Sequence, residues 1–366
     1  MRIPFAEQLD MPSTEAHLPE CPTPRPGERV VYYRSDTQFQ GVFQGYNTLD
    51  QLLVQNSSGG ITTIDNFMQV RLLDPTTRAL ACWHNLPADS KMETATKEKA
   101  VLDALLEQRI PPGPRYIDFV QEIWARGYEA FLVGGSVRDA LNGDVPSDVD
   151  LVTTMPFFFL EAVAESMFGA LGFSRHRENG FMSVGRDAAR GRGREITIDV
   201  KNFFRHAPGT ADAEFGSDLS IDHRLRDFTC NSVYYDPINA VLIDPSGSGI
   251  EDARSKTLNV VHDPALQHPV FRKAHIAMRF FGFVCRGYLP SEPCALSIRD
   301  TYKPLLAGVG TQLIQSLFQR SVLNKVDDSK KAQTFWKSKE LMELYGFGDI
   351  WDAHLRRLER TYGGRE

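Results

Sequence analysis

The sequence predicts an α+β fold: a head built on a mixed sheet, preceded by a small β-barrel and followed by a helical region. A helix is expected over residues 116–126. Residues 130–152 then have the pattern of a buried strand (130–133), a glycine turn, a helix (136–141) and a returning strand. Residues 28–73 contain short β-rich runs divided by turns. Helical spacing begins after residue 261, with helices expected over 313–323, 334–345 and 350–362. The expected units are a loose leader (1–27), the barrel (28–75), a helical linker (76–114), the head (115–261) and a helical neck (262–366).

The barrel prediction depends on five β-rich runs, which are residues 30–33, 38–43, 51–54, 61–64 and 69–73. Short strands at this spacing are typical of small barrels and resemble Src-homology-three and Tudor modules. The aromatic side chains Tyr32, Tyr33, Phe39 and Tyr46 either bind a protein or RNA ligand, or fill the core. We favour the second interpretation, because small barrels need aromatic residues for packing.

Composition limits the function classes. The chain has 366 residues, of which 42% are hydrophobic and 24% charged, as in ordinary folded proteins. A formal net charge of −6 excludes general coating of nucleic acid, so any RNA contact requires a local patch. Arginines in residues 186–194 are one candidate, although such charge runs are usually solvated loops.

Cysteine spacing and hydropathy predict the compartment. The five cysteines form neither close pairs nor a disulfide framework, which favours a reduced, cytoplasmic protein. No run approaches the roughly 20 apolar residues of a membrane helix, so no membrane span or secretory signal is expected.

Two neighbouring motifs carry the chemistry. Gly134 and Gly135 follow an apolar strand and precede a helix, and free backbone amides at such a helix start suit a phosphate group. Asp148 and Asp150 stand at i and i+2 of the next strand, so both carboxylates point to one face. Hard oxygen ligands on one face are suited to Mg²⁺.

A third acidic residue is a candidate ligand. Alternation along residues 195–201 places Glu195, Asp199 and Lys201 on one strand face and apolar residues on the other. Asp199 is the candidate, with Glu195 as the alternative. An exposed strand face explains the pattern equally well.

These motifs resemble the head domain of tRNA nucleotidyltransferases (CCA-adding enzymes) and bacterial poly(A) polymerases. The first block of the resemblance comprises Gly134, Gly135, Arg138, Asp139, Asp148, Asp150 and Leu151. The second, residues 222–236, contains Arg226, Asp227 and Asn231 in a run similar to the family's Arg-Arg-Asp-Phe-Thr-x-Asn-Ala. The third, residues 249–252, is similar to the family's Gly-Ile-Glu-Asp-Leu turn.

The resemblance implies a nucleotidyltransferase head of the polymerase-beta-like fold. It implies transfer of a nucleoside monophosphate from an NTP, ATP or CTP, to the 3′ hydroxyl of tRNA or another RNA, with two Mg²⁺ ions. Asp148 and Asp150 would hold the metal, with Asp199 as a further catalytic carboxylate. The implied nucleotide-binding residues are Gly134, Gly135, Arg138, Arg226, Asp227, Asn231, Arg272 and Arg279.

Departures from the family pattern affect base selection. The family's first arginine of the second block is Leu225 here. Where the family has an acidic pair followed three residues later by a base-reading arginine, Asp263 is followed by Leu266. We therefore expect relaxed or altered nucleotide choice.

A helical face beyond this segment is basic. Arg272, His275 and Arg279 have i, i+3 and i+7 spacing and therefore share one side of a helix. The face either contacts nucleotide or RNA phosphates, or is solvated.

Two alternative functions stay open at this point. The same chemistry in a toxin or effector would modify a protein or one particular tRNA. A relative without catalysis would only bind nucleotide or RNA.

Overall fold

The structure is a computed structural model of the whole chain. The residues it describes are 24, 27–34, 37–47, 49, 51–65, 70–72, 86–109, 113–125, 128–146, 149–155, 157–170, 172–176, 181–184, 198–206, 213–216, 219–262 and 270–362. Several predicted features lie outside them: most of the leader, Asp148, the arginine run at 186–194, Glu195 and the Asp263 to Leu266 segment.

A mixed sheet forms the centre of the head, which confirms the α+β prediction. Its strand order runs β12-β11-β8-β7-β13-β14-β6, with β10 beside β11 and β9 beside β10. Only the β8–β11 pair is parallel in this part of the sheet. The strands are β6 (Lys91–Thr94), β7 (Ala130–Val133), β8 (Val149–Thr153), β9 (Phe173–His176), β10 (Phe181–Val184), β11 (Ile198–His206), β12 (Ala213–Gly216), β13 (Tyr234–Asp236) and β14 (Val241–Asp244).

Five antiparallel strands precede the head, at the places that the sequence predicts. They are β1 (Arg29–Arg34), β2 (Thr37–Asn47), β3 (Leu52–Asn56), β4 (Ile61–Ile64) and β5 (Val70–Leu72). Strand β2 also pairs with β12, so these strands continue the head's sheet through backbone hydrogen bonds. The division of the chain into separate domains stays a prediction.

The aromatic residues of these strands mostly fill a core. Tyr32 and Tyr46 are each 2% exposed and belong to a cluster of buried residues together with Phe43. Phe39 is 41% exposed and stacks on Tyr32 at 5.5 Å between ring centroids. The side chain of Tyr33 lies outside the described part of the chain. Core filling is therefore the role of Tyr32 and Tyr46, and the ligand interpretation is wrong for these two.

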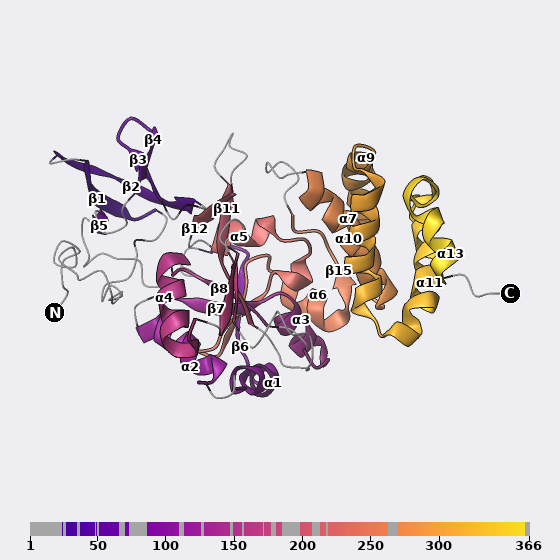
Figure 1. Cartoon of the computed structure of the whole chain (residues 1–366), viewed down its shortest axis with the longest axis horizontal. Coiled ribbons are helices and arrows are strands. Elements are labelled where there is room, and N and C mark those ends of the chain that lie inside the picture. Colours follow the sequence, from indigo (N-terminus) through magenta and orange to yellow (C-terminus); the bar gives the residue numbers. More distant parts are fainter. Residues whose placement is uncertain are drawn as a thin grey trace.

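Helices pack around the head's sheet (Figure 1). The predicted helices before and after the glycine turn are present with nearly the predicted bounds. The helices of the head are α1 (Lys97–Leu106), α2 (Tyr116–Ala125), α3 (Gly135–Asn142), α4 (Phe157–Phe168), α5 (Leu219–Asp222) and α6 (Gly249–Ser255).

Residues 270–362 are mostly helical, and the short parallel pair of β15 (Thr257–Leu258) and β16 (Leu289–Pro290) links them to the head. The helices of this region are α7 (Val270–Cys285), α8 (Glu292–Ser297), α9 (Lys303–Leu306), α10 (Thr311–Ser321), α11 (Lys331–Leu344), α12 (Gly348–Ile350) and α13 (Glu359–Tyr362). The single helix predicted over 350–362 is wrong: a wide π-type turn (Trp351–Leu355) and a 3-10 turn (Arg356–Leu358) separate α12 from α13. Trp351 and Leu355 in the wide turn are both buried.

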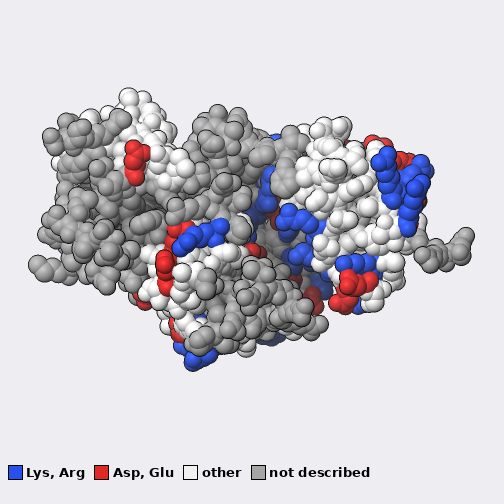
Figure 2. Space-filling model, in the orientation of Figure 1, with Lys and Arg blue, Asp and Glu red and all other residues white. Residues whose placement is uncertain are grey.

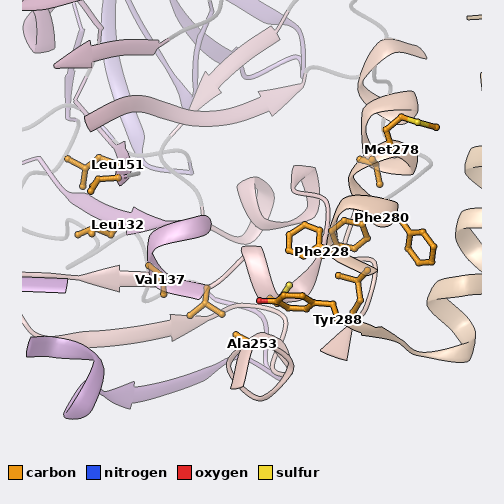
Figure 3. Packing of buried hydrophobic residues seen from close by; sticks show 14 of the residues in the cluster. Leu132, Val137, Leu151, Phe228, Ala253, Met278, Phe280 and Tyr288 are labelled. Atoms are coloured by element: carbon orange, nitrogen blue, oxygen red, sulfur yellow. The ribbon is translucent and has the colours of Figure 1, made fainter. Parts of the chain in front are cut away.

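One hydrophobic core joins the head to the helical region. Leu132 and Leu151 from the sheet belong to the same cluster as Phe228, Phe280 and Trp351. Figure 3 shows this continuity from the strands through Phe228 to the side chains of α7. Because a shared core fixes neighbouring elements relative to each other, α7 is held as a rigid wall beside the glycine turn. Within the described residues, no helix is long and apolar enough to cross a membrane.

Candidate functional site

The glycine turn and the carboxylate strand meet. Gly134 joins β7 to α3 with a φ of 76°, a backbone conformation that side chains other than glycine's rarely adopt. Strand β8 lies antiparallel to β7, with Val133 opposite Asp150. A Cβ atom added at Gly134 would lie 3.4 Å from Oδ2 of Asp150. The amides at the start of α3 and the Asp150 carboxylate therefore face the same space.

Asp150 is an ionised, partly accessible carboxylate. Its side chain is 34% exposed, and the ammonium of Lys201 lies 2.8 Å from Oδ1. Burial raises the pKa of Asp150, but the positive charge of Lys201, with Arg226 and Arg279 further away, brings the net pKa below its usual value. The carboxylate therefore stays charged at neutral pH, as a metal ligand must.

Asp199 lies on the strand beside Asp150. The two residues are direct partners in the parallel β8–β11 pair, so their side chains share one face of the sheet. The hydroxyl of Ser183 donates a hydrogen bond of 2.5 Å to Oδ1 of Asp199, which orients that carboxylate. Two neighbouring carboxylates on one face fit a divalent cation. Among the residues that the structure describes, no three potential metal ligands gather, and Asp148 is outside that set.

A buried hydrogen-bonded chain links α3 to α7 through the second sequence block. The guanidinium of Arg138 pairs with Asp139 at 2.6 Å and donates a bond of 2.6 Å to Oδ1 of Asn231. The amide of Asn231 donates to both oxygens of Asp227, at 3.0 and 3.2 Å. Asp227 in turn forms an ion pair with Arg279 of α7. Four predicted binding residues, Arg138, Asn231, Asp227 and Arg279, are thus members of one network.

The charge on Asp227 is maintained by this network. Burial alone would raise the pKa of Asp227, but the guanidiniums of Arg279 and Arg272 hold it far below its usual value. Arg272 also donates to the backbone carbonyl of Leu225 at 3.2 Å. The basic face of α7 therefore packs on the head, and the interpretation that it is merely solvated is wrong.

Arg226 occupies a separate buried cluster. It donates to Oδ2 of Asp222 at 2.7 and 2.9 Å, and the hydroxyl of Tyr234 donates to the same oxygen at 2.5 Å. The guanidinium also lies 5.0 Å from the centre of the Tyr234 ring. Arg226 therefore supports β13 and acts on the carboxylate of Asp150 through its charge.

The third sequence block anchors the second. Thr229 donates to Oδ2 of Asp252 at 2.5 Å, and the side-chain amide of Asn259 donates to the same oxygen at 3.0 Å. Asp252 belongs to α6, whose residues Gly249–Asp252 are the predicted turn. The three sequence blocks are therefore adjacent in space.

A basic cavity of about 390 Å³ opens where the head meets α7 and α10. The residues that line it are Gly135, Arg138, Asp139, Asp150, His275, Arg279, Phe283, Arg286, Arg320, Ser321 and Lys325. Arginine and lysine outnumber the acidic residues in this lining, so the cavity favours a polyanion. Figure 2 shows Lys and Arg side chains gathered along the hollow between the head and the helical region.

The predicted residues divide into two groups by position. Gly135, Arg138, Asp150 and Arg279 line the cavity, and a Cβ atom added at Gly134 would lie 3.4 Å from the carboxylate of Asp150. Asn231 and Asp227 lie behind the lining and hold Arg138 and Arg279 in place. Arg226, Arg272 and Asp199 do not line the cavity.

Sequence reasoning missed part of the cavity wall. Arg286 follows Arg279 by seven residues and lies directly after α7. It therefore continues the basic spacing of Arg272, His275 and Arg279. Lys201 alternates with Asp199 on the polar strand face, but the alternation does not show that it pairs with Asp150. Nothing local in the sequence indicates Arg320, Ser321 or Lys325, because they reach the cavity through packing of α10 on α7.

Comparisons with known proteins agree with the three blocks. Residues 130–259 match the family model of the poly A polymerase head domain. Poly(A) polymerase I of Haemophilus influenzae is 27% identical over 158 residues, which cover 42% of this chain and 34% of that protein. The CCA-adding enzyme of Enterococcus faecalis is 27% identical over 212 residues, which cover 56% of this chain and 48% of that protein.

One solved structure gives the scale of the structural similarity. The crystal structure of the Bacillus stearothermophilus CCA-adding enzyme in complex with CTP has a TM-score of 0.43 and 24% identity, covering 56% of this chain and 47% of that chain. The chain spans between about a third and a half of the length of the two curated relatives, 34% and 48%.

Proposed function

We propose, from the match of residues 130–259 to the family model of the poly A polymerase head domain, that the protein is a metal-dependent nucleotidyltransferase. The reaction transfers a nucleoside monophosphate from an NTP to the 3′ hydroxyl of an RNA. The acceptor oxygen forms a bond to the α-phosphorus, the bond between that phosphorus and the bridging oxygen breaks, and pyrophosphate leaves. The hydroxyl proton passes to solvent.

The observation that carries this proposal is the contact between a glycine turn and a charged carboxylate. Gly134 approaches the carboxylate of Asp150 closely enough that an added Cβ would lie 3.4 Å from Oδ2. Backbone amides at a helix start bind phosphate oxygens, and a carboxylate beside them can hold a cation against the same phosphates. Both requirements of phosphoryl transfer, positioning and charge neutralisation, are therefore met at one place.

We assign the metal to Asp148 and Asp150, with Asp199 as a further carboxylate. Asp150 stays ionised, and Asp199 shares its sheet face. Two bound Mg²⁺ ions would neutralise charge on the phosphates and activate the attacking oxygen. Lys201 helps to keep Asp150 charged, and the hydroxyl of Ser183 orients Asp199.

The triphosphate lies, in this proposal, on the amides of Gly134 and Gly135 and against Arg138 and Arg279. Their guanidiniums line the cavity and are fixed from behind by Asn231 and Asp227. Fixed cations aimed at developing charge stabilise a transition state without reorganisation. Arg226 and Arg272 contribute through their charge and by bracing the network.

ATP and CTP are the proposed substrates, because curated relatives are named as poly(A) polymerase and CCA-adding enzymes. The base-reading segment differs from the family at Asp263 and Leu266. We therefore propose relaxed nucleotide choice and a tRNA or other RNA 3′ end as the acceptor.

The test is incorporation of each labelled NTP, one at a time, into total RNA and total protein in the presence of Mg²⁺. We expect label in RNA, with more than one NTP accepted. Asp148→Ala and Asp150→Asn should abolish it, whereas Asp352→Asn, which changes an exposed carboxylate on the wide turn, should not.

Each outcome decides between functions. Label in a protein band would replace this proposal with a protein-modifying enzyme. Nucleotide binding by calorimetry with no labelled product from any acceptor would indicate a binding protein, and strict CCA synthesis would contradict relaxed nucleotide choice.

A further inference from the structure

The hydroxyl of Ser321 is buried in the cavity wall without a partner. Ser321 ends α10 and is 5% exposed, and its Oγ has no hydrogen-bond partner within the described part of the chain. A buried polar group left in this state destabilises the protein, because it has lost its hydrogen bonds to water. Ser321 also lines the basic cavity, so a ligand in the cavity can supply the missing bond.

Close packing of two helices puts this hydroxyl there. A Cβ atom added at Gly282 of α7 would lie 2.0 Å from the carbonyl oxygen of Ser321. Only glycine permits this approach, which brings the end of α10 against α7. Arg286, which directly follows α7, and Arg320 of α10 line the cavity together with Ser321.

These two arginines lack carboxylate partners. Within the described residues, neither Arg286 nor Arg320 forms an ion pair, whereas Arg138 and Arg279 pair with Asp139 and Asp227. Among the described residues, the side chain of Arg286 donates a hydrogen bond only to the carbonyl of Gly282, at 3.1 Å. Their charges are therefore available to a ligand.

Like charges crowd around Arg286. The guanidiniums of Arg286, Arg138 and Arg279 lie 4.4, 5.1 and 5.7 Å from the centre of the same ring, that of Phe283. Burial, then Arg138 and Arg279, lower the pKa of Arg286 to about 10, so it is still charged at neutral pH. An anion would relieve the repulsion among these groups.

We propose that Ser321, Arg320 and Arg286 form a second phosphate subsite in the same cavity, next to the triphosphate subsite of Gly135, Arg138 and Arg279. Guanidinium forks and a hydroxyl are donors suited to phosphate oxygens. Its residues come from the helical region, whereas Gly135 and Asp150 of the same cavity come from the head. We infer that its occupant is a backbone phosphate near the 3′ end of the acceptor RNA. This identity rests on the proposed function.

The geometry of the reaction favours the acceptor over the NTP. In an in-line attack the acceptor oxygen approaches the α-phosphorus from the side opposite the leaving pyrophosphate. In this proposal the pyrophosphate leaves at the glycine turn of the head, so the acceptor approaches from the side of the helical region. Its last backbone phosphate then lies beside Arg286 and Arg320.

The experiment measures binding without turnover. Fluorescence anisotropy of a 5′-labelled single-stranded RNA with a free 3′ hydroxyl, without NTP, gives the RNA affinity and its salt dependence. Calorimetry with ATP and with CTP, without RNA, gives the nucleotide affinity. The variants are Ser321→Ala, Arg286→Gln combined with Arg320→Gln, and the control Arg356→Gln, an exposed cation on a short turn of the helical region.

We expect the double variant to bind RNA at least tenfold more weakly, with a salt slope smaller by about 1 to 2. Ser321→Ala should weaken RNA binding by about threefold to fivefold, and both should bind ATP and CTP within twofold of wild type. Because the Ser321 hydroxyl makes no hydrogen bond to the residues that the structure describes, its alanine variant should melt at or above the wild-type temperature. Arg356→Gln should leave RNA affinity within twofold.

Equal losses of ATP and RNA affinity would overturn the proposal by assigning these residues to the triphosphate. Unchanged RNA affinity in both variants would also overturn it. Failure of the proposed function is distinguishable: a wild type that binds RNA through Arg320 yet labels no RNA would contradict the catalytic proposal and leave the phosphate site standing.

Discussion

The ammonium of Lys201 lies 2.8 Å from Oδ1 of Asp150, on the carboxylate that faces the glycine turn. The pair connects the parallel strands β8 and β11, and both side chains are about one third exposed. A positive side chain in contact with a proposed metal ligand has two opposing effects. It keeps the carboxylate ionised, and it competes with a divalent cation for the same oxygen.

Removing the charge of Lys201 tests which effect is larger. We expect Lys201→Met to bind Mn²⁺ about two- to fivefold more tightly at pH 7.5, because a partly exposed ion pair contributes up to roughly 1 kcal/mol. Asp150 remains ionised at that pH without Lys201, so the loss of competition dominates. The measurement is Mn²⁺ titration by electron paramagnetic resonance, with Lys256→Met, whose partner Asp144 is outside the cavity lining, as the control. Weaker Mn²⁺ binding in Lys201→Met would show that the lysine mainly supports the carboxylate.

The sequence predicted the head's site most accurately where the signals are local. Strand β7 has the predicted bounds, and the return from α3 to β8 follows because Gly143 ends the helix in a left-handed conformation. Apolar periodicity and glycine positions act over a few residues, so they can be seen in a single sequence. The contact between Gly134 and Asp150 follows from that local order.

The helical wall could not be predicted in the same way. The arginines of α7 have regular spacing, but their partners Asp227 and Leu225 are about 50 residues earlier in the chain. Arg320 and Ser321 reach the cavity only because Gly282 lets α10 approach. Such placement depends on long-range packing, which hydrophobic periodicity does not specify.

The pH dependence of stability should depend on His275. Burial, then Arg279 and Arg272, lower the pKa of His275 to about 3, against about 6.5 in an unfolded chain. Between these values the unfolded chain binds a proton that the folded protein does not, so the free energy of unfolding falls as the pH drops below about 6.5. At pH 7.5 the histidine is neutral in both states and contributes nothing to this dependence.

His275→Gln should therefore flatten the stability profile. Between pH 7.5 and 5.0 we expect wild type to lose about 1 kcal/mol more free energy of unfolding than the variant, after allowing for partial exposure of the ring. Urea denaturation at the two pH values provides the measurement. Equal losses in both proteins would exclude His275 as a source of the pH dependence.

Arg138 should not tolerate lysine. Its planar guanidinium contacts Asp139 and Asn231 at once, and it is 5% exposed. A lysine ammonium cannot reproduce this fork, so Asn231 would lose a buried donor. We expect Arg138→Lys to lower the free energy of unfolding by about 2 kcal/mol and to reduce nucleotide affinity more than tenfold.

Arg115 provides the matched control for this change. It also contacts two carboxylates, Asp118 and Glu107, but its side chain is 33% exposed and outside the cavity. Arg115→Lys should cost less than about 1 kcal/mol and leave nucleotide affinity unchanged. Similar losses in the two variants, by chemical denaturation and calorimetry, would mean that burial of Arg138 has no special role.

The two ends of α3 allow strain to be separated from contact with the site. Gly134 and Gly143 both have positive φ, at 76° and 82°. A Cβ atom at Gly134 would lie 3.4 Å from the Asp150 carboxylate, whereas one at Gly143 meets nothing within 4 Å. Alanine at either position should cost roughly 1 to 2 kcal/mol of stability, because each backbone conformation disfavours a side chain.

Gly134→Ala should in addition reduce nucleotide transfer per folded molecule more than tenfold, since the methyl group stands between the amides and the carboxylate. Gly143→Ala should transfer nucleotide at the wild-type rate per folded molecule, as measured by labelled-NTP incorporation alongside thermal melting. If both variants lose activity in proportion to stability alone, the close approach of the turn to Asp150 has no role in the reaction.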